Sequence, residues 1–191
     1  LTFFSRFKSA LALIPDWTFA IEGLEEEQKR RDERHAKLTA PIQAVVEKID
    51  SKYSLFPYQN ECVRFAEMSD GNCLQGLSMG LGKSLISLSW TVIKNFRVLV
   101  VCPKVVRRTW IQEAKKFYSS VFNDLNSVEL TPKSIKKYGL PDLSGIKIAS
   151  VNYQSLAKFL PSIEKAGFDV LICDESHMLK NEKAQITGTV H

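Results

Sequence analysis

The sequence predicts an α/β fold, in which a parallel sheet flanked by helices follows an N-terminal helical appendage. Three observations support this prediction. From Tyr53 onward, short apolar runs alternate with segments of helix length, which is typical of parallel sheets with helical crossovers. A glycine-containing loop, residues 77–84, stands between an apolar run and a helix-like run. Residues 1–52 differ in composition and carry a run of charges, so we interpret them as a helical appendage or linker.

The composition excludes several classes of protein. With 191 residues and 45% hydrophobic content, the chain can bury a core. Its 26 Lys and Arg residues exceed its 21 Asp and Glu residues, and the net charge of +5 permits a nucleic-acid partner without requiring one. The four cysteines lack the paired spacing of zinc or redox sites, and they indicate a reducing compartment. No apolar run reaches the roughly 18 to 20 residues that span a bilayer, so no membrane partner is expected.

The N-terminal region is expected to be helical. A charge run extends from Glu22 to Lys37, and three acids in it stand four residues before three bases, which places opposite charges on one helix face. These residues are Glu25, Glu26 and Glu27, then Lys29, Arg30 and Arg31. A solvated helix is the simpler interpretation and a docking surface is the alternative. After Pro41, apolar residues at helical spacing from Ile42 to Ile49 predict a short amphipathic helix.

Short apolar runs and the segments between them predict the sheet and its helices. The candidate strands are Asn72–Leu77, Arg97–Cys102, Ile146–Val151 and Val170–Cys173. Strands that are buried on both faces of a parallel sheet have this composition. The candidate helices are Tyr58–Met68, Lys83–Lys94, Val105–Tyr118 and a shorter one after Asn152. Because ligands bind such sheets beyond the carboxyl ends of the strands, the residues that follow the strands are candidates for a site.

The loop Leu77–Ser84 has the features of a phosphate cradle. Its glycines allow a tight turn, and the N–H groups of the loop and of the following helix would face an anion. Lys83 would reach the terminal phosphates, and the hydroxyl of Ser84 would bind magnesium. A strict Walker A pattern has glycine where this chain has Leu77, while Gly76 comes one residue too early. The loop alone therefore does not identify an ATP site.

A second constellation follows the last candidate strand. Asp174, Glu175, Ser176 and His177 come directly after four apolar residues, so a strand would deliver the two acids to the edge of the sheet. Asp174 can hold magnesium through water, and Glu175 can orient and deprotonate an attacking water. A helix N-cap followed by an acidic first turn is the alternative. Asp174 lies 174 − 83 = 91 residues after Lys83, which accommodates about three strand-plus-helix units of roughly 30 residues.

In their order, these motifs resemble those of the first RecA-like lobe of superfamily 2 helicases, specifically the Swi/Snf-type DNA translocases. The family motif Asp-Glu-Met-Gly-Leu-Gly-Lys-Thr is matched by Leu-Ser-Met-Gly-Leu-Gly-Lys-Ser at 77–84, and Asp-Glu-Ser/Ala-His is matched at 174–177. The resemblance implies a P-loop, RecA-like fold with ATP and magnesium as cofactors. It implies catalytic roles for Lys83, Asp174, Glu175 and His177, and magnesium binding by Ser84 and Asp174. It implies nucleotide binding by Gln59, Met79, Gly80, Leu81, Gly82, Lys83 and Ser84.

Weaker matches extend the resemblance. Leu55–Gln59 resembles the segment whose glutamine reads adenine, so Gln59 is the candidate; a surface glutamine at a helix start is the alternative. Val101–Lys104, with Trp110 and Glu113 downstream, and Ser150–Tyr153 resemble motifs that meet the nucleic-acid backbone. They imply nucleic-acid contacts by Pro103, Lys104, Asn152 and Tyr153. A solvated loop lysine and a turn asparagine are the alternatives for Lys104 and Asn152.

The resemblance also predicts the domain organisation, with the first lobe at 53–191 ending before the later helicase motifs. Ile186–Thr189 resembles the third motif, but it follows Asp174 by only 186 − 174 = 12 residues, so Thr187 is expected in the helix after the second motif. A second RecA-like lobe outside this sequence is expected to supply arginines to the γ-phosphate. Such arginines are worth about 10³ to 10⁵ in rate, so the isolated chain is expected to be poorly active.

The sequence therefore predicts the ATP-binding lobe of an ATP-dependent translocase acting on duplex DNA. Its expected location is intracellular, in the nucleus of a eukaryote or the cytoplasm of a bacterium or virus-infected cell. Two alternatives stay open. In the first, the chain is a degenerate ATPase lobe that serves as an interaction or regulatory module, and Leu77 and Ser78, which replace the family's acidic pair, are signs of decay. In the second, it is an RNA-directed ATPase of superfamily 2.

Overall fold

The computed structural model describes residues 15–179, and side chains from residue 26 onward within that range. The chain divides into two compact units, Leu1–Ala40 and Pro41–His191. The first unit contains the helix α2 (Pro15–Thr39), on which residues 26–37 are all exposed. The predicted spacing of its charges is confirmed for one pair, since Arg31 and Glu27 lie 2.7 Å apart. Both side chains are mostly exposed, so this pair adds little stability.

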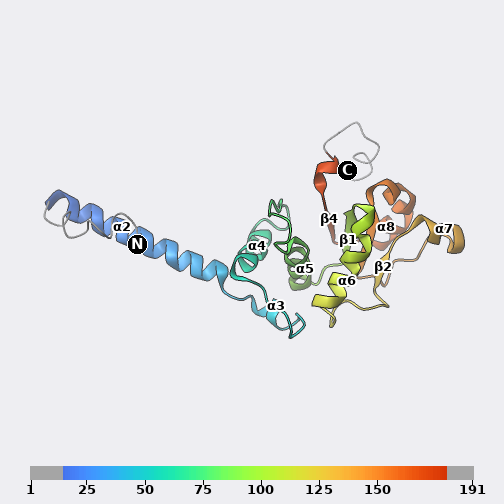
Figure 1. Cartoon of the computed structure of the whole chain (residues 1–191), viewed down its shortest axis with the longest axis horizontal. Helices are drawn as coiled ribbons and strands as arrows, with labels where there is room; N and C mark the ends of the chain where they lie inside the picture. The colour runs from blue at the N-terminus through green and yellow to red at the C-terminus, as the bar shows by residue number, and fades with distance from the viewer. Residues whose placement is uncertain (1–14, 180–191) are drawn as a thin grey trace. The chain divides into compact units, whose positions relative to one another are not determined.

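The second unit is built on a four-stranded parallel sheet with the strand order β2-β3-β1-β4 (Figure 1). The strands are β1 (Val98–Cys102), β2 (Ser127–Glu129), β3 (Ile148–Asn152) and β4 (Val170–Cys173). Val98 of β1 is in register with Ile148 on one side and with Val170 on the other. The predicted fold class is therefore confirmed, and every strand runs toward the same edge of the sheet.

Helices cover both faces of this sheet. They are α3 (Gln43–Val46), α4 (Pro57–Met68), α5 (Lys83–Lys94), α6 (Arg107–Phe117), α7 (Pro132–Tyr138) and α8 (Leu160–Ala166), with the 3₁₀ turns η1 (Lys104–Val106), η2 (Tyr153–Phe159) and η3 (Ser176–Leu179). Val98, Val100 and Cys102 pack with α5 and α6, while Leu99 and Val101 pack with η2 on the opposite face. This alternation is the period of two of a strand that is buried on both faces.

The predicted helices agree with the structure. Lys83–Lys94 has the predicted bounds, and Tyr58–Met68 is extended by one residue because Pro57 occupies the first turn, where it is tolerated. The helix predicted from Val105 begins at Arg107, since Lys104–Val106 forms a 3₁₀ turn. The short helix after Pro41 is α3, which buries Val45 in the core of the second unit. Thr187 and Ala184 lie outside the described residues.

The strand predicted at Asn72–Leu77 is wrong. Residues 73–78 form no strand, although partly buried and exposed positions alternate along the segment as they would in one. Gly76 disfavours a strand, and Lys83 Nζ bonds to the carbonyl of Leu77 at 2.9 Å. A cleft separates this segment from β4, which is the edge of the described sheet and in which Leu171 is exposed and the other residues are partly buried. The strand β2 was not predicted from the sequence.

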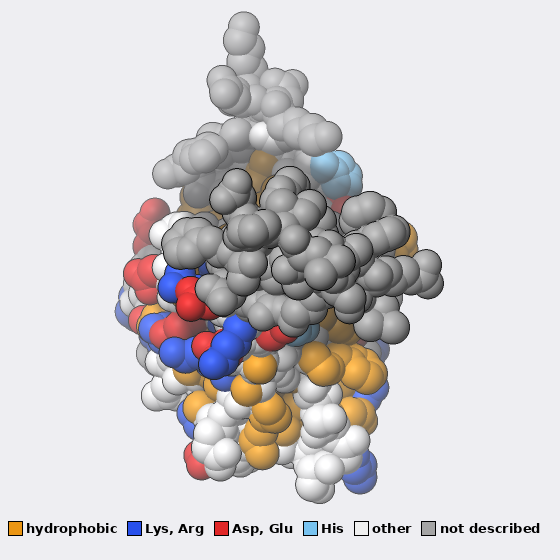
Figure 2. Space-filling model, turned by 90° about the vertical axis from the view of Figure 1, so that its left-hand side faces the viewer, with side chains coloured by type: hydrophobic (Ala, Val, Ile, Leu, Met, Phe, Trp, Pro, Cys, Tyr) orange, Lys and Arg blue, Asp and Glu red, His pale blue; other side chains and the backbone are white. Residues whose placement is uncertain are grey.

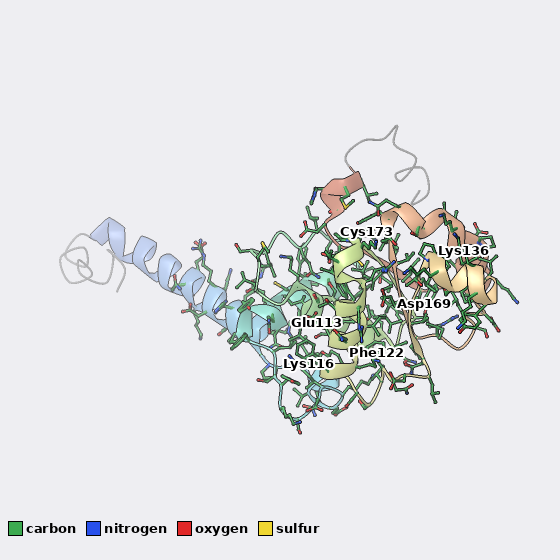
Figure 3. The ribbon with its side chains drawn as sticks, turned by 45° about the vertical axis from the view of Figure 1, so that its right-hand side comes forward. Glu113, Lys116, Phe122, Lys136, Asp169 and Cys173 are labelled. Carbon is green, nitrogen blue, oxygen red and sulfur yellow. The ribbon has the colours of Figure 1, made fainter. Side chains whose placement is uncertain are left out.

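Where side chains are coloured at the left of Figure 2, Lys and Arg side chains stand next to Asp and Glu side chains. At the amino edge of the sheet, Arg97 ties several loops together. Its Nε donates to the carbonyl of Ile146 at 3.1 Å and its Nη2 to that of Leu143 at 2.7 Å, while its backbone N–H donates to Asp169. Figure 3 shows Asp169 and Cys173 at opposite ends of β4. These hydrogen bonds fix the loops at the amino edge of the sheet.

Candidate nucleotide-binding site

The carboxyl edge of the sheet borders a cleft of about 570 Å³. One wall is the extended segment 73–79 with Lys83 of α5, and the other is β4 with the turn that follows it. Asp174, Glu175 and His177 all line this second wall. The structure therefore brings the glycine-containing loop and the acidic motif to one cleft, as the parallel topology requires.

Both glycines of the loop have left-handed backbone conformations. Gly80 has a φ of 81° and Gly82 a φ of 75°, values that residues other than glycine rarely adopt. A Cβ atom at Gly80 would meet open space, whereas one at Gly82 would lie 2.5 Å from Nε2 of Gln59. Gly82 caps α5, whose first N–H groups have no partner within the helix. The turn thus leaves the first N–H groups of α5 without a side-chain cap at the start of the helix that carries Lys83 and Ser84.

Lys83 bonds to its own loop. Its Nζ donates to the carbonyls of Leu77 at 2.9 Å and Ser78 at 3.3 Å, and the side chain is half-buried. Ser84 follows it in the first turn of α5 and is also half-buried. Met79 and Leu81 are exposed on the loop, with Met79 at 92%.

Gln59 connects α4 to the loop. Its Nε2 donates to the carbonyl of Leu81 at 3.3 Å, as does the hydroxyl of Tyr58 at 3.1 Å, and its Oε1 accepts the backbone N–H of Phe56 at 3.0 Å. Gln59 is buried, so the alternative of a surface glutamine does not hold. The rings of Phe56 and Tyr58 stack beside it with centroids 6.0 Å apart, and Phe56 is exposed.

Asp174 is held by three elements. Its backbone N–H donates to the carbonyl of Val101 at 2.9 Å, and its own carbonyl accepts the hydroxyl of Tyr153 at 2.8 Å. Its carboxylate Oδ2 accepts the indole Nε1–H of Trp110 at 2.9 Å. The partners belong to β1, η2 and α6, so three elements together fix the position of Asp174.

Glu175 has a strained backbone. Its φ of 54° lies in the left-handed region, which costs a residue other than glycine on the order of 1 kcal/mol and is concentrated at functional sites. Its Oε2 lies 3.1 Å from Nδ1 of His177, and both side chains are exposed by more than half. The helix N-cap alternative for Asp174 does not hold, because Glu175 leaves the helical region before η3 begins at Ser176.

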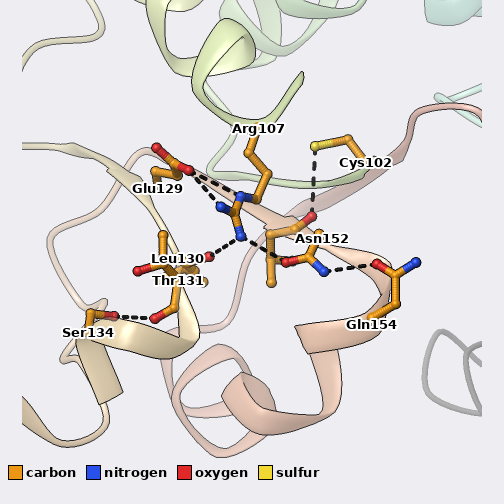
Figure 4. Close-up of polar contacts among 9 residues, drawn as sticks. Cys102, Arg107, Glu129, Leu130, Thr131, Ser134, Asn152 and Gln154 are labelled. Carbon is orange, nitrogen blue, oxygen red and sulfur yellow. Dashed lines mark hydrogen bonds and ion pairs between the residues drawn. The ribbon is translucent and has the colours of Figure 1, made fainter. Parts of the chain in front are cut away.

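Asn152 and Tyr153, to which the resemblance assigns nucleic-acid contacts, are buried in the structure. Asn152 Oδ1 accepts Nη1 of Arg107 at 2.8 Å, and Tyr153 bonds to Asp174. Arg107, itself 7% exposed, also pairs with Glu129 at 2.9 Å and donates to the carbonyl of Leu130 at 3.3 Å (Figure 4). The side chains of this Arg107 cluster are already satisfied within the protein, so they support the edge rather than face a ligand.

Basic side chains remain exposed at the same edge. Pro103 and Lys104 follow β1, with Pro103 half-buried and Lys104 exposed. Lys133, Lys136 and Lys137 of α7, which follows β2, are also exposed, and Nζ of Lys137 lies 4.7 Å from the ring centroid of exposed Tyr138. Figure 3 labels Lys136 on α7. Sequence reasoning missed this helix, although lysines beside a tyrosine in a stretch without acids, residues 130–141, were a usable signal.

The thiols at this edge are neutral. Burial raises the pKa of Cys102 to about 12 and also raises that of Cys173. A thiolate is the reactive form of cysteine, so these residues do not provide a nucleophile.

Among residues 15–179, no group of three His, Cys, Asp or Glu side chains is placed to hold a metal. Within the same residues, no helix is long and apolar enough to cross a membrane.

Comparison with known proteins agrees with these features. The model of the SNF2-related domain matches residues 58–191. A Caenorhabditis elegans homolog of SWI/SNF-related matrix-associated actin-dependent regulator of chromatin subfamily A-like protein 1 is 35% identical over 138 residues, covering 70% of this chain and 19% of the relative. Mouse DNA annealing helicase and endonuclease ZRANB3 is 29% identical, covering 68% and 12%. Chicken DNA repair and recombination protein RAD54-like is 27% identical, covering 76% and 23%.

Among solved structures, the Sulfolobus solfataricus SWI2/SNF2 ATPase core in complex with dsDNA superposes with a TM-score of 0.62 at 22% identity, covering 80% of this chain and 31% of that one. This likeness concerns the fold. The chain spans less than a quarter of the length of each of the three relatives named above. Because the SNF2-related model matches well over half of the sequence, the chain belongs to the SNF2-related domain family.

Proposed function

We propose that this chain is the nucleotide-binding lobe of an ATP-dependent translocase that acts on duplex DNA. The observation that carries the proposal is the cleft of about 570 Å³ in which the loop of Lys83 faces Asp174 and Glu175. Membership of the SNF2-related family supports it, as do relatives named for annealing-helicase and DNA-repair activities.

The loop and the start of α5 bind the phosphates of ATP. The left-handed turns at Gly80 and Gly82 direct backbone N–H groups to the anion, and Lys83 moves from the carbonyls of Leu77 and Ser78 to the terminal phosphates. Ser84 and Asp174 hold magnesium, which when bound neutralises charge that develops on the phosphate oxygens. Gln59 binds the adenine edge, and its contact with the Leu81 carbonyl links adenine binding to the phosphate loop.

Glu175 acts on the attacking water. A carboxylate at the mouth of the cleft can orient this water and accept its proton. His177 bonds to Oε2 of Glu175 and so directs the other carboxylate oxygen, Oε1, to the water. A second RecA-like lobe supplies the arginines that stabilise the transition state, so the 191-residue chain alone hydrolyses ATP slowly.

Duplex DNA lies along the carboxyl edge. Lys104 and the three lysines of α7 contact the DNA phosphates, and Pro103 shapes the turn before Lys104. Asn152 and Tyr153 stabilise this edge through their hydrogen bonds to Arg107 and Asp174. Lysine contacts to phosphate release counterions, which makes binding dependent on salt but not on sequence.

Titration of fluorescently labelled ATP against the chain and against Lys83→Ala tests the nucleotide site. Binding by the first and not by the variant is the expected result. If neither binds, the degenerate interaction module is the correct function instead. In the full-length protein, stimulation of ATP hydrolysis by RNA and not by duplex DNA would exclude a DNA translocase in favour of an RNA-directed ATPase.

The DNA surface has its own test in the double variant Lys136→Gln/Lys137→Gln. Each lost phosphate contact lowers the slope of log affinity against log salt by about 0.9, so we expect weaker duplex binding and a slope reduced by roughly 2. Lys116→Gln/Lys165→Gln, with exposed lysines in the last turns of α6 and α8 at the amino edge, is the matched control. Equal losses in the two variants would indicate a general charge effect and remove α7 from the DNA surface.

A further inference from the structure

Trp110 is a buried residue whose polar group is committed to the acidic motif. Its indole Nε1–H donates to Oδ2 of Asp174 at 2.9 Å, and the side chain is 5% exposed. Asp174 lines the cleft, so with Oδ2 held by the indole the second carboxylate oxygen, Oδ1, is the one available to a ligand there. Hydrogen bonds to the other oxygen of a ligating carboxylate fix its orientation.

The helix that carries Trp110 is itself fixed at its first residue. Arg107 precedes Trp110 by three positions, so the two side chains leave neighbouring parts of the same helix face. Arg107 is bonded to Glu129 at the end of β2 and to Asn152 at the end of β3. The rest of α6 packs on β1 through Ile111 and Ala114. The indole is therefore presented to Asp174 from an anchored helix, which is what a preorganised site requires.

We propose that Trp110 is a positioning residue for the magnesium carboxylate: its indole N–H holds Oδ2 of Asp174 so that Oδ1 faces the ion bound with the nucleotide. This inference rests on the proposed function, because it gives Asp174 its partner in that site. Trp110 lines the cleft, but its polar group is engaged by Asp174 and it belongs to α6 rather than to the phosphate loop. Its loss is therefore expected to change the effect of magnesium and to leave the phosphate contacts of the loop in place.

A second tryptophan provides the matched control. Trp90 of α5 is 6% exposed, nearly the same as Trp110, but within residues 26–179 its Nε1 is buried without a hydrogen-bond partner. Trp110→Phe and Trp90→Phe therefore remove the same N–H group from equally buried rings, and only the first change releases Asp174. Thermal unfolding of both variants checks that they are folded.

The experiment measures the affinity of the 191-residue chain for a labelled, non-hydrolysable ATP analogue in magnesium and in EDTA. For the unchanged protein, magnesium should tighten binding. Loss of a side chain that orients a metal ligand typically costs 10- to 100-fold in metal affinity, so in Trp110→Phe the tightening should fall by about 10-fold or more, with unchanged affinity in EDTA. Trp90→Phe should keep the full effect of magnesium.

The outcomes separate the two proposals. If the unchanged chain binds no nucleotide, the proposed function fails and the role of Trp110 fails with it. If the unchanged chain shows the magnesium effect and Trp110→Phe shows it equally, only the positioning role is overturned. A loss of affinity in Trp110→Phe that is the same in magnesium and EDTA also overturns it, because a purely structural defect acts on both.

A measurement on the unchanged protein covers the case in which Trp110→Phe does not fold. The ¹⁵N resonance of the Trp110 indole can be assigned by eliminating those of Trp90 and Trp17 with their Phe variants. We expect it to shift when magnesium is added to the complex with the ATP analogue, while the indole resonance of Trp90 shifts less. A Trp110 resonance that is insensitive to magnesium contradicts the inference.

Discussion

Gly82 is constrained by its backbone and by its neighbour at once. Gly80→Ala and Gly82→Ala both place a side chain on a left-handed backbone, at a cost of about 1 kcal/mol. Only at Gly82 does the new Cβ meet Gln59. We therefore expect Gly82→Ala to lower the melting temperature and the ATP affinity more than Gly80→Ala does.

A double variant isolates this contact. Gln59→Ala should recover part of the stability lost in Gly82→Ala, because it removes the atom that the Cβ would meet, and it should recover nothing in Gly80→Ala. Equal melting temperatures for the two glycine variants would mean that backbone strain alone decides the effect. Thermal denaturation of the unchanged protein, the three single variants and the two double variants gives the coupling directly.

Tyr118 gives the core a dependence on high pH. Burial raises its pKa to about 12, although its hydrogen bond with Ser89 acts in the opposite direction. The neutral phenol is favoured in the folded state, so its contribution is complete below pH 10 and is lost as the pH rises to 12. A shift of about two units corresponds to roughly 3 kcal/mol in the free energy of unfolding. Denaturant titrations between pH 9 and 12 should show a smaller fall in Tyr118→Phe, with exposed Tyr138→Phe behaving like the unchanged protein.

At the scale of elements, the Arg107 cluster joins α6 to two strands. Arg107→Ala leaves Glu129 and Asn152 without their shared partner, and removing one member of a buried ion pair typically costs about 3 to 5 kcal/mol. Glu129 keeps some solvent access, which places the expected loss near the lower limit. Arg108→Ala, at the next and exposed position, should change the free energy of unfolding little. Similar denaturant midpoints for both variants would show that the cluster adds no stability.

Which elements were predictable depended on how local their signals are. The helix Lys83–Lys94 was predicted with its bounds, since glycine before it and helical periodicity within it are local features. The strand Ser127–Glu129 has no apolar run, and its pairing of Val128 with Ala149 joins distant parts of the chain. The Arg107 cluster depends on that strand, so it could not be predicted either. The segment 73–78 bonds to α5 through Gln75 and Ser87, and a local sequence pattern does not reveal such a contact.

The site followed the same logic. Asp174 and Lys83 were expected at one edge because parallel strands end together, and the structure places both at one cleft. The family resemblance predicted nucleic-acid contacts for Asn152 and Tyr153, but a motif match does not reveal whether a side chain is buried. Their partners, Arg107 and the carbonyl of Asp174, come from other segments.

For the whole molecule, the division into two units predicts where the chain can be shortened. A chain of residues 41–191 keeps the second unit complete and should melt at the temperature of the 191-residue chain. A chain of residues 53–191 loses Val45 from the core, together with the bond from Lys48 Nζ to the Val92 carbonyl at 3.0 Å. It should melt several degrees lower, since removal of a large buried side chain costs about 2 to 5 kcal/mol. Calorimetry of the three chains distinguishes a domain boundary near residue 40 from one near residue 52.

Under the proposed function, the carbonyls of Leu77 and Ser78 compete with the phosphates of ATP for Lys83. Its ammonium has two carbonyl acceptors before any phosphate arrives, so binding is an exchange of hydrogen bonds and not a simple gain of them. The contribution of Lys83 to ATP affinity is the difference between the free energy of its bonds to phosphate and that of its bonds to these carbonyls. Substitutions that weaken the carbonyl bonds by loosening Leu77–Ser78 should therefore increase the affinity for the nucleotide. Under the proposed function, the same carbonyls accept the Lys83 ammonium again when the product leaves, which favours release.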